Sequence, residues 1–308
     1  MSELRHVSSN PHVRSRMSTQ KIMLIVILSL LPATGFGIWN FGLRSAAVVL
    51  VCVLASVVSE YLFTFFMKKE MTVTDLSAVV TGLLLALNLP PTIPLWMAAS
   101  GAVFAIIIVK ELFGGLGQNF MNPALAGRCF LMICFAANMT DFVYDGVSQA
   151  TPLALLRQGN NVSLLNMITG RIPGTIGETS VIAIAIGAVV LIITGVIDIR
   201  IPFTYIPVFL VFMGLFSGRG WDLNYLAAEL CGGGLMLGAF FMATDYVTSP
   251  ITIRGKYVYG ICLGILTGIF RTFSSSAEGV SFAIIISNLL VPLIEQATLP
   301  KPFGKGGE

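Results

Sequence analysis

The sequence predicts an all-α, polytopic membrane protein with about ten transmembrane helices, and two observations lead to that prediction. Of the 308 residues, 56% are hydrophobic and only 11% are charged, and the mean hydropathy is +0.88. A soluble domain carries about 25% charged residues, so this balance excludes an ordinary soluble enzyme. Apolar runs of nearly the length that a helix needs to cross a bilayer core of about 30 Å recur along the chain.

Hydropathy defines the predicted spans, which are placed at 22–39, 45–66, 76–88, 93–110, 120–138, 180–197, 201–217, 225–243, 257–270 and 280–298. The first span follows a polar, basic segment and has no clear small-residue cleavage site, so we expect a retained helix. The third is short because LNLPPTIP follows, and proline stops a helix. The ninth is also short and is followed by RTFSSSAEG.

These spans divide the chain into five regions, which are a basic tail (1–21), a first helical half (22–138), a loop (139–179), a second helical half (180–298) and a tail (299–308). Lysine and arginine collect in short loops on the cytoplasmic side of a membrane. With the N-terminus inside, twelve of the 18 lysines and arginines fall on that side and five on the other, with Arg128 within a span. We therefore expect a multi-pass protein of the cell (inner) membrane, with both termini cytoplasmic and 139–179 extracytoplasmic.

The two halves resemble each other faintly. GLLLALNLPP (82–91) compares with GLMLGAFFMATDYVTSP (234–250), because each is an apolar helix that breaks at Asn or Asp and proline. KELFGGLGQNFMNPALAG (110–127) compares with FRTFSSSAEGVSFAIIIS (270–287). Five spans in each half would give two inverted repeats with broken helices, a design that places a ligand where the breaks meet.

Charge, cysteine and histidine usage narrow the possible cofactors and partners. The net charge of +3 gives no argument for a nucleic-acid partner. No metal site is expected: none of the five cysteines forms a C-x-x-C pair, and they are interpreted as small buried hydrophobes. Both histidines, His6 and His12, lie in the N-terminal tail, which excludes bis-histidine haem ligation within the spans. The cysteines are Cys52, Cys129, Cys134, Cys231 and Cys262.

Polar side chains near the breaks are the candidate site residues, because such groups at membrane depth are costly and usually functional. They are Asn88, Asn119, Asn122, Arg128, Arg171, Thr175, Glu178, Thr179, Thr244, Asp245, Thr248 and Ser249. Arg128 must meet an anion or carbonyl groups, and a ligand phosphate or a carboxylate such as Asp245 would serve. Glycine amides, a guanidinium and amide side chains together indicate an anion-binding cavity near one membrane face.

Structural interpretations of the same residues stay open. Thr175 and Glu178 have the spacing of a capping box at the start of the following helix. The segment ATDYVTSP (243–250) is also typical of a helix end whose carbonyls are met by hydroxyls. Four acids in or near spans are interpreted as interfacial carboxylates, with contact to a coupling ion as the alternative. They are Glu60, Glu111, Glu229 and Glu278.

Four motifs occur in order along most of the chain and carry a resemblance to a known family. They are NPALAGR (122–128), DGVSQATPL (145–153), IGETS (176–180) and FMATDYVTSP (241–250). Together they resemble the D subunit of the Rnf-type ion-translocating ferredoxin:NAD oxidoreductase, which is paralogous to the B subunit of the sodium-pumping NADH:quinone reductase. Taken alone, DGVSQATPL is typical of a polar loop that closes onto a short helix.

The resemblance implies a covalent flavin. In that family a flavin transferase couples FMN to a threonine through a phosphoester, at a pattern similar to Asp-x-x-Ser/Thr-Gly-Ala-Thr/Ser. Asp145, Ser148 and Ala150 match this pattern and make Thr151 the implied attachment point, while Gln149 stands where glycine is usual. Thr151 would be a linkage, and no catalytic acid or base is assigned.

The resemblance also implies partners and a role. The protein would relay electrons through FMN and help couple ferredoxin–NAD electron transfer to Na⁺ or H⁺ movement, next to the FMN-bearing G subunit and the membrane-embedded A and E subunits. Some members hold a second, noncovalent flavin, riboflavin. The residues expected to line a flavin cavity are Asn119, Asn122, Arg128, Thr175, Glu178, Asp245 and Thr248.

Two other functions remain open from the sequence. A secondary transporter or channel of inverted-repeat architecture would use the broken helices to bind a solute and would carry no redox cofactor. A structural membrane scaffold would use the polar clusters only for packing.

Overall fold

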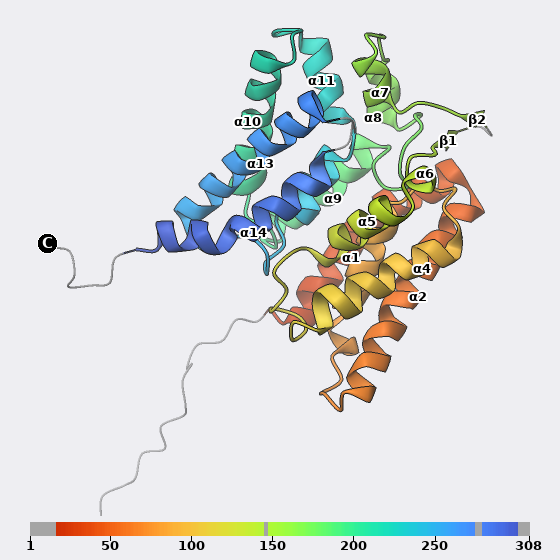
Figure 1. The fold of residues 1–308 in the computed structure, drawn as a ribbon, viewed down its shortest axis with the longest axis vertical. Helices are drawn as coiled ribbons and strands as arrows, with labels where there is room; N and C mark the ends of the chain where they lie inside the picture. The colour runs from red at the N-terminus through yellow and green to blue at the C-terminus, as the bar shows by residue number, and fades with distance from the viewer. Residues whose placement is uncertain (1–16, 145–146, 275–278, 301–308) are drawn as a thin grey trace, which may run out of the picture.

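The computed structural model describes residues 17–144, 147–274 and 279–300, and most of these residues are helical (Figure 1). The first half contains α1 (Thr19–Phe41), α2 (Leu43–Phe66), η1 (Val73–Asp75), α3 (Ser77–Leu87), α4 (Leu95–Val103), η2 (Phe104–Glu111), α5 (Pro123–Cys134) and α6 (Ala136–Met139). The helix η2 has π-helical hydrogen bonding and continues α4 without a break.

The loop between the halves folds into short elements, which are β1 (Val143–Tyr144), β2 (Val147–Ser148), α7 (Pro152–Arg157) and α8 (Leu164–Thr169). The antiparallel pairing of β1 with β2 is the one departure from the all-α expectation among the described residues. The second half contains α9 (Val181–Ile193), α10 (Arg200–Phe216), α11 (Leu223–Cys231), α12 (Leu235–Leu237), the π-helical η3 (Gly238–Met242), α13 (Ile253–Phe273) and α14 (Val280–Thr298).

Helices occur in the predicted order, but only some of them have the length of a span. Four helices, α1, α2, α13 and α14, are long and apolar enough to cross a membrane alone. The pair 223–231 and 235–242, bent by 62°, adds a fifth if it counts as one broken span. The apolar helices α3, α5, α9 and α10 are shorter, with 10–17 residues. The described residues therefore provide four or five candidate spans where ten were expected.

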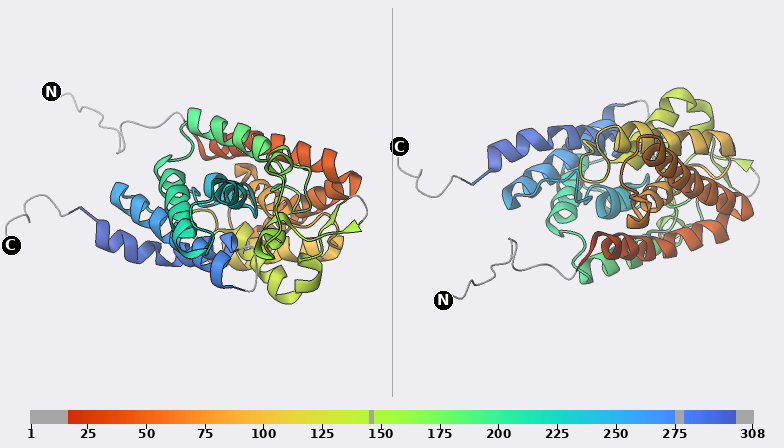
Figure 2. Two further views of the ribbon diagram at one scale, coloured as in Figure 1. Left: turned by 90° about the horizontal axis from the view of Figure 1, so that it is seen from above. Right: turned by 90° about the horizontal axis from the view of Figure 1, so that it is seen from below.

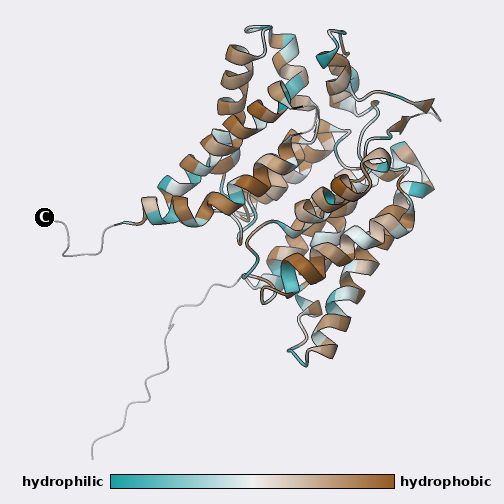
Figure 3. Cartoon of the chain, in the orientation of Figure 1, coloured by the Kyte–Doolittle hydropathy of each residue, from teal (hydrophilic) through white to brown (hydrophobic). Residues whose placement is uncertain are grey.

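Apolar residues cover most of the helices, as a multi-pass membrane protein requires (Figure 3). Large apolar side chains are exposed along single helix faces, such as Leu24, Leu28 and Leu31 on α1 and Ile182 and Ile186 on α9. A soluble monomer rarely exposes such continuous apolar stripes, whereas lipid is a suitable solvent for them.

Hydrogen bonds between loops define one end of the bundle, here called the loop end. Arg44 donates to the Thr92 carbonyl at 2.7 Å, and the Thr92 hydroxyl donates to the Asp141 carbonyl at 2.9 Å. The Asn40 amide donates to the Gly170 carbonyl at 3.2 Å. Asp141 and Gly170 therefore lie close to the turn between α1 and α2, and Figure 1 shows β1, β2, α7 and α8 in the upper right of the view.

The opposite end, here called the terminal end, holds the start of α1 and the end of α14. There Lys256 at the start of α13 donates to Asp198 at 2.7 Å, and Thr252 and Thr298 share a hydrogen bond of 2.6 Å. Burial opposes the charge of Asp198, but hydrogen bonds from Lys256 and from the Arg200 backbone amide outweigh it, so the pKa of this carboxyl is lowered from its usual value.

Small residues allow the closest helix contacts. Gly187 on α9 faces the Ser29 carbonyl on α1, where a Cβ would clash, and Figure 2 shows α1 and α9 side by side in both views. On α13, Gly260, Gly264 and Gly268 recur every four residues and face the α10 residues Thr204, Val208, Phe209 and Phe212. Such a stripe lets two backbones approach closely within a membrane, where lipid supplies no hydrophobic drive between helices.

We expect Gly264→Ala to destabilise the protein by about 1–3 kcal/mol through overpacking. A Cβ at this position would lie 2.7 Å from Val208 Cγ1 and 2.9 Å from the Phe209 backbone nitrogen, and the backbone cannot move aside easily. The measurement is the temperature at which the detergent-purified protein loses its sharp size-exclusion peak. Gly35→Ala is the matched control, since a Cβ on this α1 glycine meets nothing within 4 Å. Equal melting of the two variants would contradict the α10–α13 packing.

Candidate functional site

Thr151 lies at the loop end, as the N-cap of α7. Its hydroxyl accepts a long hydrogen bond of 3.4 Å from the Ala154 amide, and its side chain is half-buried. Pro152 follows at the first helical position, where its missing N–H is harmless. The loop on its N-terminal side is tied by β1–β2 pairing and by a bond of 2.9 Å from the Gln149 amide to the Phe142 carbonyl.

The other residues of the attachment motif are described only in part. Asp145 lies outside the described residues. Ser148 belongs to β2, where its backbone is opposite Val143. The position of Thr151 at the start of a short helix agrees with the sequence-based expectation of a loop closing onto one.

Two arginines hold α7 against the bundle. Arg157 donates to the Arg271 carbonyl at 2.6 Å, and Arg219 donates to the Leu156 carbonyl at 2.8 Å. Leu153 is buried against Gly232 and Gly233, which separate α11 from α12. The Thr151 segment is thus fixed to the break in the second half of the chain.

A buried polar cluster lies where the helix breaks of both halves meet. Arg128 on α5 donates to Asn88 Oδ1 at 3.2 Å, to Ser281 Oγ at 2.8 Å and to Glu178 Oε1 at 3.4 Å. The Arg128 and Glu178 side chains are 5% and 6% exposed. Gly234, with φ 67°, faces Glu178 so closely that a Cβ would clash with the carboxylate. Arg128 was expected to meet an anion or carbonyl groups, and in the structure it meets a buried carboxylate, that of Glu178 and not that of Asp245.

The turn that supplies Glu178 is bound to the end of α3. The Ile176 amide donates to the Leu89 carbonyl at 3.0 Å, and the Gly177 amide donates to the Leu87 carbonyl at 2.8 Å. The capping-box interpretation is wrong, because the N-cap of α9 is Ser180, whose hydroxyl accepts from the Ala183 amide at 3.3 Å. The Thr175 hydroxyl is buried and has no hydrogen-bond partner among the described residues. Arg171, in the same turn, is exposed.

Four other predicted residues line one pocket towards the terminal end, here called the central pocket. Asn119, Asn122, Thr244 and Asp245 lie on its wall together with Phe240 and Tyr246, and its cavity volume is about 80 Å³. Asn122 caps α5 by accepting from the Ala124 amide at 3.0 Å, and its amide donates to the Met242 carbonyl at 3.3 Å.

One polar atom on the wall of the central pocket has no hydrogen-bond partner among the described residues. Asn119 Oδ1 is buried and accepts no hydrogen bond from any described residue. Thr248 donates to Asp245 Oδ2 at 3.1 Å and so fixes that carboxylate at the wall. The hydroxyl of Thr244 returns to the Phe240 carbonyl at 2.7 Å, as the helix-end interpretation of ATDYVTSP expects.

The structure thus places most of the predicted site residues in three groups. Asn119, Asn122, Thr244 and Asp245 line the central pocket, with Thr248 behind Asp245. Arg128 and Glu178 form an ion pair that also joins Asn88. Thr151 lies at the loop end and is not among the residues that line the central pocket.

Two buried ion pairs were not predicted from the sequence. Glu60 on α2 pairs with Lys110 on η2 at 2.8 Å, and Glu229 on α11 pairs with Arg271 on α13 at 3.0 Å. Glu60 and Glu229 are therefore buried, and the interfacial interpretation of them is wrong. Glu111 is buried as well, and Glu278 lies outside the described residues. In the sequence, these ion pairs are indicated only by a basic residue in or beside one apolar segment and an acidic residue in or beside another.

Arg271 directly follows the predicted ninth span, but it lies in the last turn of α13 and is 5% exposed. Its guanidinium also donates to the Gly232 carbonyl at 2.8 Å and lies 5.0 Å from the Phe209 ring centroid. The same guanidinium that neutralises Glu229 therefore holds the break between α11 and α12.

Comparison with known proteins agrees with the four motifs. The model of the NQR2, RnfD, RnfE family matches residues 6–304. The chain is 46% identical over 307 residues to the D subunit of the Na(+)-translocating ferredoxin:NAD(+) oxidoreductase complex of Acetobacterium woodii, covering 97% of this chain and 95% of that protein. It is 40% identical over 316 residues to the D subunit of the proton-translocating ferredoxin:NAD(+) oxidoreductase complex of Clostridium ljungdahlii, covering 97% and 96%. It is 33% identical over 348 residues to the D subunit of the ion-translocating oxidoreductase complex of Escherichia coli, covering 97% and 98%.

Proposed function

This chain belongs to the NQR2, RnfD, RnfE family, and from that premise we propose that it is the membrane-embedded D subunit of an ion-translocating ferredoxin:NAD oxidoreductase complex. It relays electrons through FMN attached to Thr151. Two relatives of similar identity are named for different ions, Na⁺ and H⁺, so the coupling ion is one of these two.

The observation that carries the flavin proposal is the placement of Thr151. Its side chain is only half-buried at the start of α7, and its hydroxyl oxygen makes only a long contact to a backbone amide, which an ester oxygen can keep. An FMN bound there supplies chemistry that no side chain has, because a flavin accepts two electrons and passes them on singly. Arg157 and Arg219 hold the attachment helix to the bundle and so limit where the cofactor can reach.

We propose that the polar edge of the second, noncovalent flavin enters the central pocket, because a cavity of about 80 Å³ can take only part of a three-ring flavin. Asn119 Oδ1, which accepts no hydrogen bond from the described residues, suits a donor on the polar edge of a flavin ring. Asn122 and Asp245 offer further polar contacts, and Phe240 and Tyr246 offer aromatic surface. Arg128 and Glu178 would act behind this wall by fixing the helix breaks.

We also propose ten crossings in two inverted repeats. The first helices of the two halves, α1 and α9, pack together, and in each half the second helix packs on the fourth, α2 on α4 and α10 on α13. The third element of each half breaks at a polar residue, Asn88 after α3 and Asp245 after η3. On this topology both termini are cytoplasmic and Thr151 is extracytoplasmic, facing the FMN-bearing G subunit, with the membrane-embedded A and E subunits as further neighbours.

Mass spectrometry of the peptide spanning 145–157 tests this proposal. The protein must be produced with a flavin transferase, and the peptide is expected to carry the mass of esterified FMN. Acid denaturation is expected to release only the noncovalent flavin, so the same preparation tests the central pocket. An unmodified peptide from the native host would overturn the redox role and favour the transporter or scaffold functions.

The chain needs partners to turn over. We assign it no nicotinamide fingerprint and no four-cysteine cluster motif. The isolated protein should therefore show no activity with NADH even when its flavins are in place.

A further inference from the structure

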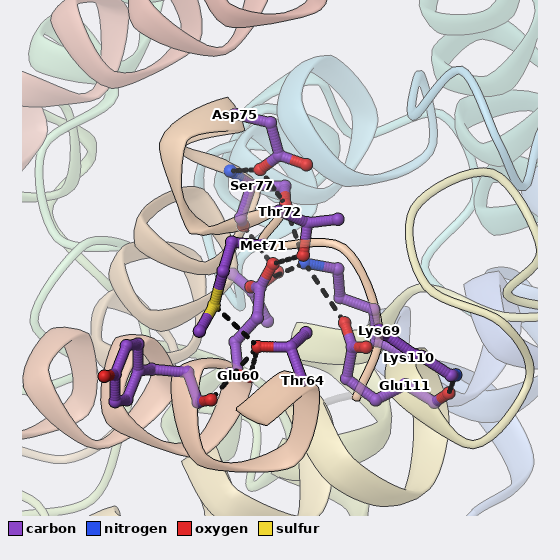
Figure 4. Close-up of polar contacts among 11 residues, drawn as sticks. Glu60, Thr64, Lys69, Met71, Thr72, Asp75, Ser77, Lys110 and Glu111 are labelled. Atoms are coloured by element: carbon purple, nitrogen blue, oxygen red, sulfur yellow. Dashed lines mark hydrogen bonds and ion pairs between the residues drawn. The ribbon is translucent and has the colours of Figure 1, made fainter. Parts of the chain in front are cut away.

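A buried charge cluster near the terminal end is separate from the residues assigned to flavins. Lys110 Nζ lies 2.8 Å from Glu60 Oε2, 2.6 Å from Ser77 Oγ and 3.8 Å from Glu111 Oε1 (Figure 4). The side chains of Lys110 and Glu60 are 2% and 0% exposed. Lys110 lies in the π-helix η2, a type of helix often found at functional sites.

The oxygen atoms around Lys110 come from three elements. Thr72 donates to the second oxygen of Glu60 at 2.6 Å, and the Ser77 amide donates to Asp75 Oδ1 at 2.7 Å. Glu111 Oε1 is buried and accepts no hydrogen bond from any described residue, although its carboxylate points towards Lys110 in Figure 4. The Lys110 ammonium is therefore surrounded by oxygen atoms, and one of them, Glu111 Oε1, can still accept a hydrogen bond.

A cavity reaches this cluster from the terminal end. The volume of this cavity is about 400 Å³. Three acids and one base lie on its wall, Glu70, Asp75 and Glu111 against Lys69, and the hydroxyl residues Thr19, Thr64 and Thr72 complete the polar part. A cleft with an excess of one charge concentrates ions of the opposite sign. Cations are therefore enriched beside Glu111.

We propose that this cavity is a binding site for a monovalent alkali cation of the Na⁺ type, which competes with the Lys110 ammonium for Glu60. The ligands are the carboxylates of Glu60 and Glu111 and the hydroxyls of Thr72 and Ser77. Hard cations prefer such oxygen ligands. The proposed ligands include no nitrogen or sulfur atom, so the site does not suit a transition metal.

Charge balance explains why the cation is monovalent. A buried charge without a partner is strongly unfavourable, so Glu60 needs one positive charge at all times. Glu60 and Glu111 carry two negative charges against the single positive charge of Lys110, so one Na⁺ completes the balance, whereas a divalent ion would leave an excess positive charge. Na⁺ takes the place of the ammonium at Glu60, and Lys110 keeps Glu111, 3.8 Å away, as its counter-ion.

The released ammonium connects the cation to the central pocket. Lys110 and Ser77 both line that pocket, while Glu111, Thr72 and Asp75 line the cavity on the other side, and Leu116 borders both. The Glu60–Lys110 pair is thus part of the wall between them. This inference rests on the ion-coupled function proposed above and names the place on this chain where the ion binds.

The test is ²²Na⁺ binding to the purified complex that contains this chain, with choline chloride keeping the ionic strength constant. Glu60→Gln is expected to weaken Na⁺ binding about tenfold or more, because it removes the charged ligand. Lys110→Gln is expected to strengthen binding about tenfold, because it removes the competitor. Asp198→Asn is the matched control, since this carboxylate is at the same end but pairs with Lys256 and Arg200, and the Na⁺ affinity of this variant should be unchanged.

The opposite directions of the two variants separate cation competition from damage to the fold, which would weaken binding in both. Where Glu60→Gln fails to assemble, Glu111→Gln takes its place and should also weaken binding. No Na⁺ binding by the wild-type complex, or weaker binding by Lys110→Gln, would overturn the inference. Flavin fluorescence of the same preparations is read independently, so a complex that keeps its flavin and binds no Na⁺ rejects the cation site and leaves the redox proposal standing.

Discussion

Replacing Thr151 with valine is expected to abolish covalent flavin on this chain completely and, with it, electron transfer by the assembled complex. Valine has nearly the shape of threonine but no hydroxyl, so no phosphoester can form. The helix itself should survive, because loss of an N-cap side chain costs only about 1 kcal/mol. The measurement is in-gel fluorescence of the denatured protein under ultraviolet light, followed by the intact mass.

Two further variants distinguish loss of the flavin-attachment hydroxyl from loss of a helix N-cap. Thr151→Ser keeps a hydroxyl at the same backbone position and is expected to retain flavin, at least in part. Thr252→Val removes a comparable cap, the hydroxyl that accepts from the Gly255 amide at 3.0 Å at the start of α13, and should leave the flavin signal unchanged. Persistent fluorescence in Thr151→Val would show that the flavin is attached elsewhere.

The second large effect is expected at the centre of the bundle, where Arg128→Met should destabilise the protein by about 3–5 kcal/mol. The substitution leaves the Glu178 carboxylate buried beside Gly234 without its guanidinium, and it removes the hydrogen bonds to Asn88 and Ser281. Because these groups end or begin four different helical segments, we expect loss of assembled protein rather than a local change.

Thermal loss of the size-exclusion peak measures this effect. The double variant Arg128→Met/Glu178→Gln should be more stable than the single one, since it removes the unpaired charge. Arg200→Met is the control, because its ion pair with Asp198 is partly exposed and such pairs contribute about 0–1 kcal/mol. Similar melting of Arg128→Met and Arg200→Met would reject the central role of the Arg128–Glu178 pair.

The order of the helices could be predicted from the sequence because each depends on local hydropathy. The predicted spans 22–39, 45–66 and 280–298 differ from α1, α2 and α14 by three residues or fewer at each boundary. The ninth span is longer than predicted, since α13 extends over Gly255 at one end and Arg271 at the other. Glycine and arginine lower the local hydropathy there. Gly255 is nevertheless helical and lies beside Thr298 of α14, and Arg271 is held by the Phe209 ring of α10 and by its ion pair with Glu229.

The partners of the charged residues could not be predicted, because they depend on how deeply each side chain is buried and not on the hydropathy of the neighbouring sequence. The sequence predicts that Arg128 meets an anion or carbonyl groups, but both Asp245 and Glu178 are available in the sequence as carboxylate partners. The choice is made by the turn that binds the end of α3 and carries Glu178 inwards. Glu60 and Lys110 lie 50 residues apart near the ends of two apolar segments, where a charge in a hydropathy profile normally marks the water boundary. Only the packing of α2 against η2 shows that both are buried.

The anchorage of α7 has a consequence for how the chain tolerates sequence divergence. Arg157 and Arg219 both bind main-chain oxygens, those of Arg271 and Leu156, and every amino acid supplies such an oxygen. As far as these two bonds are concerned, the acceptor residues can change, whereas the donor side chains must stay long enough to reach them. Homologous chains are therefore expected to keep long donor side chains at both positions while the residue at the Leu156 position changes.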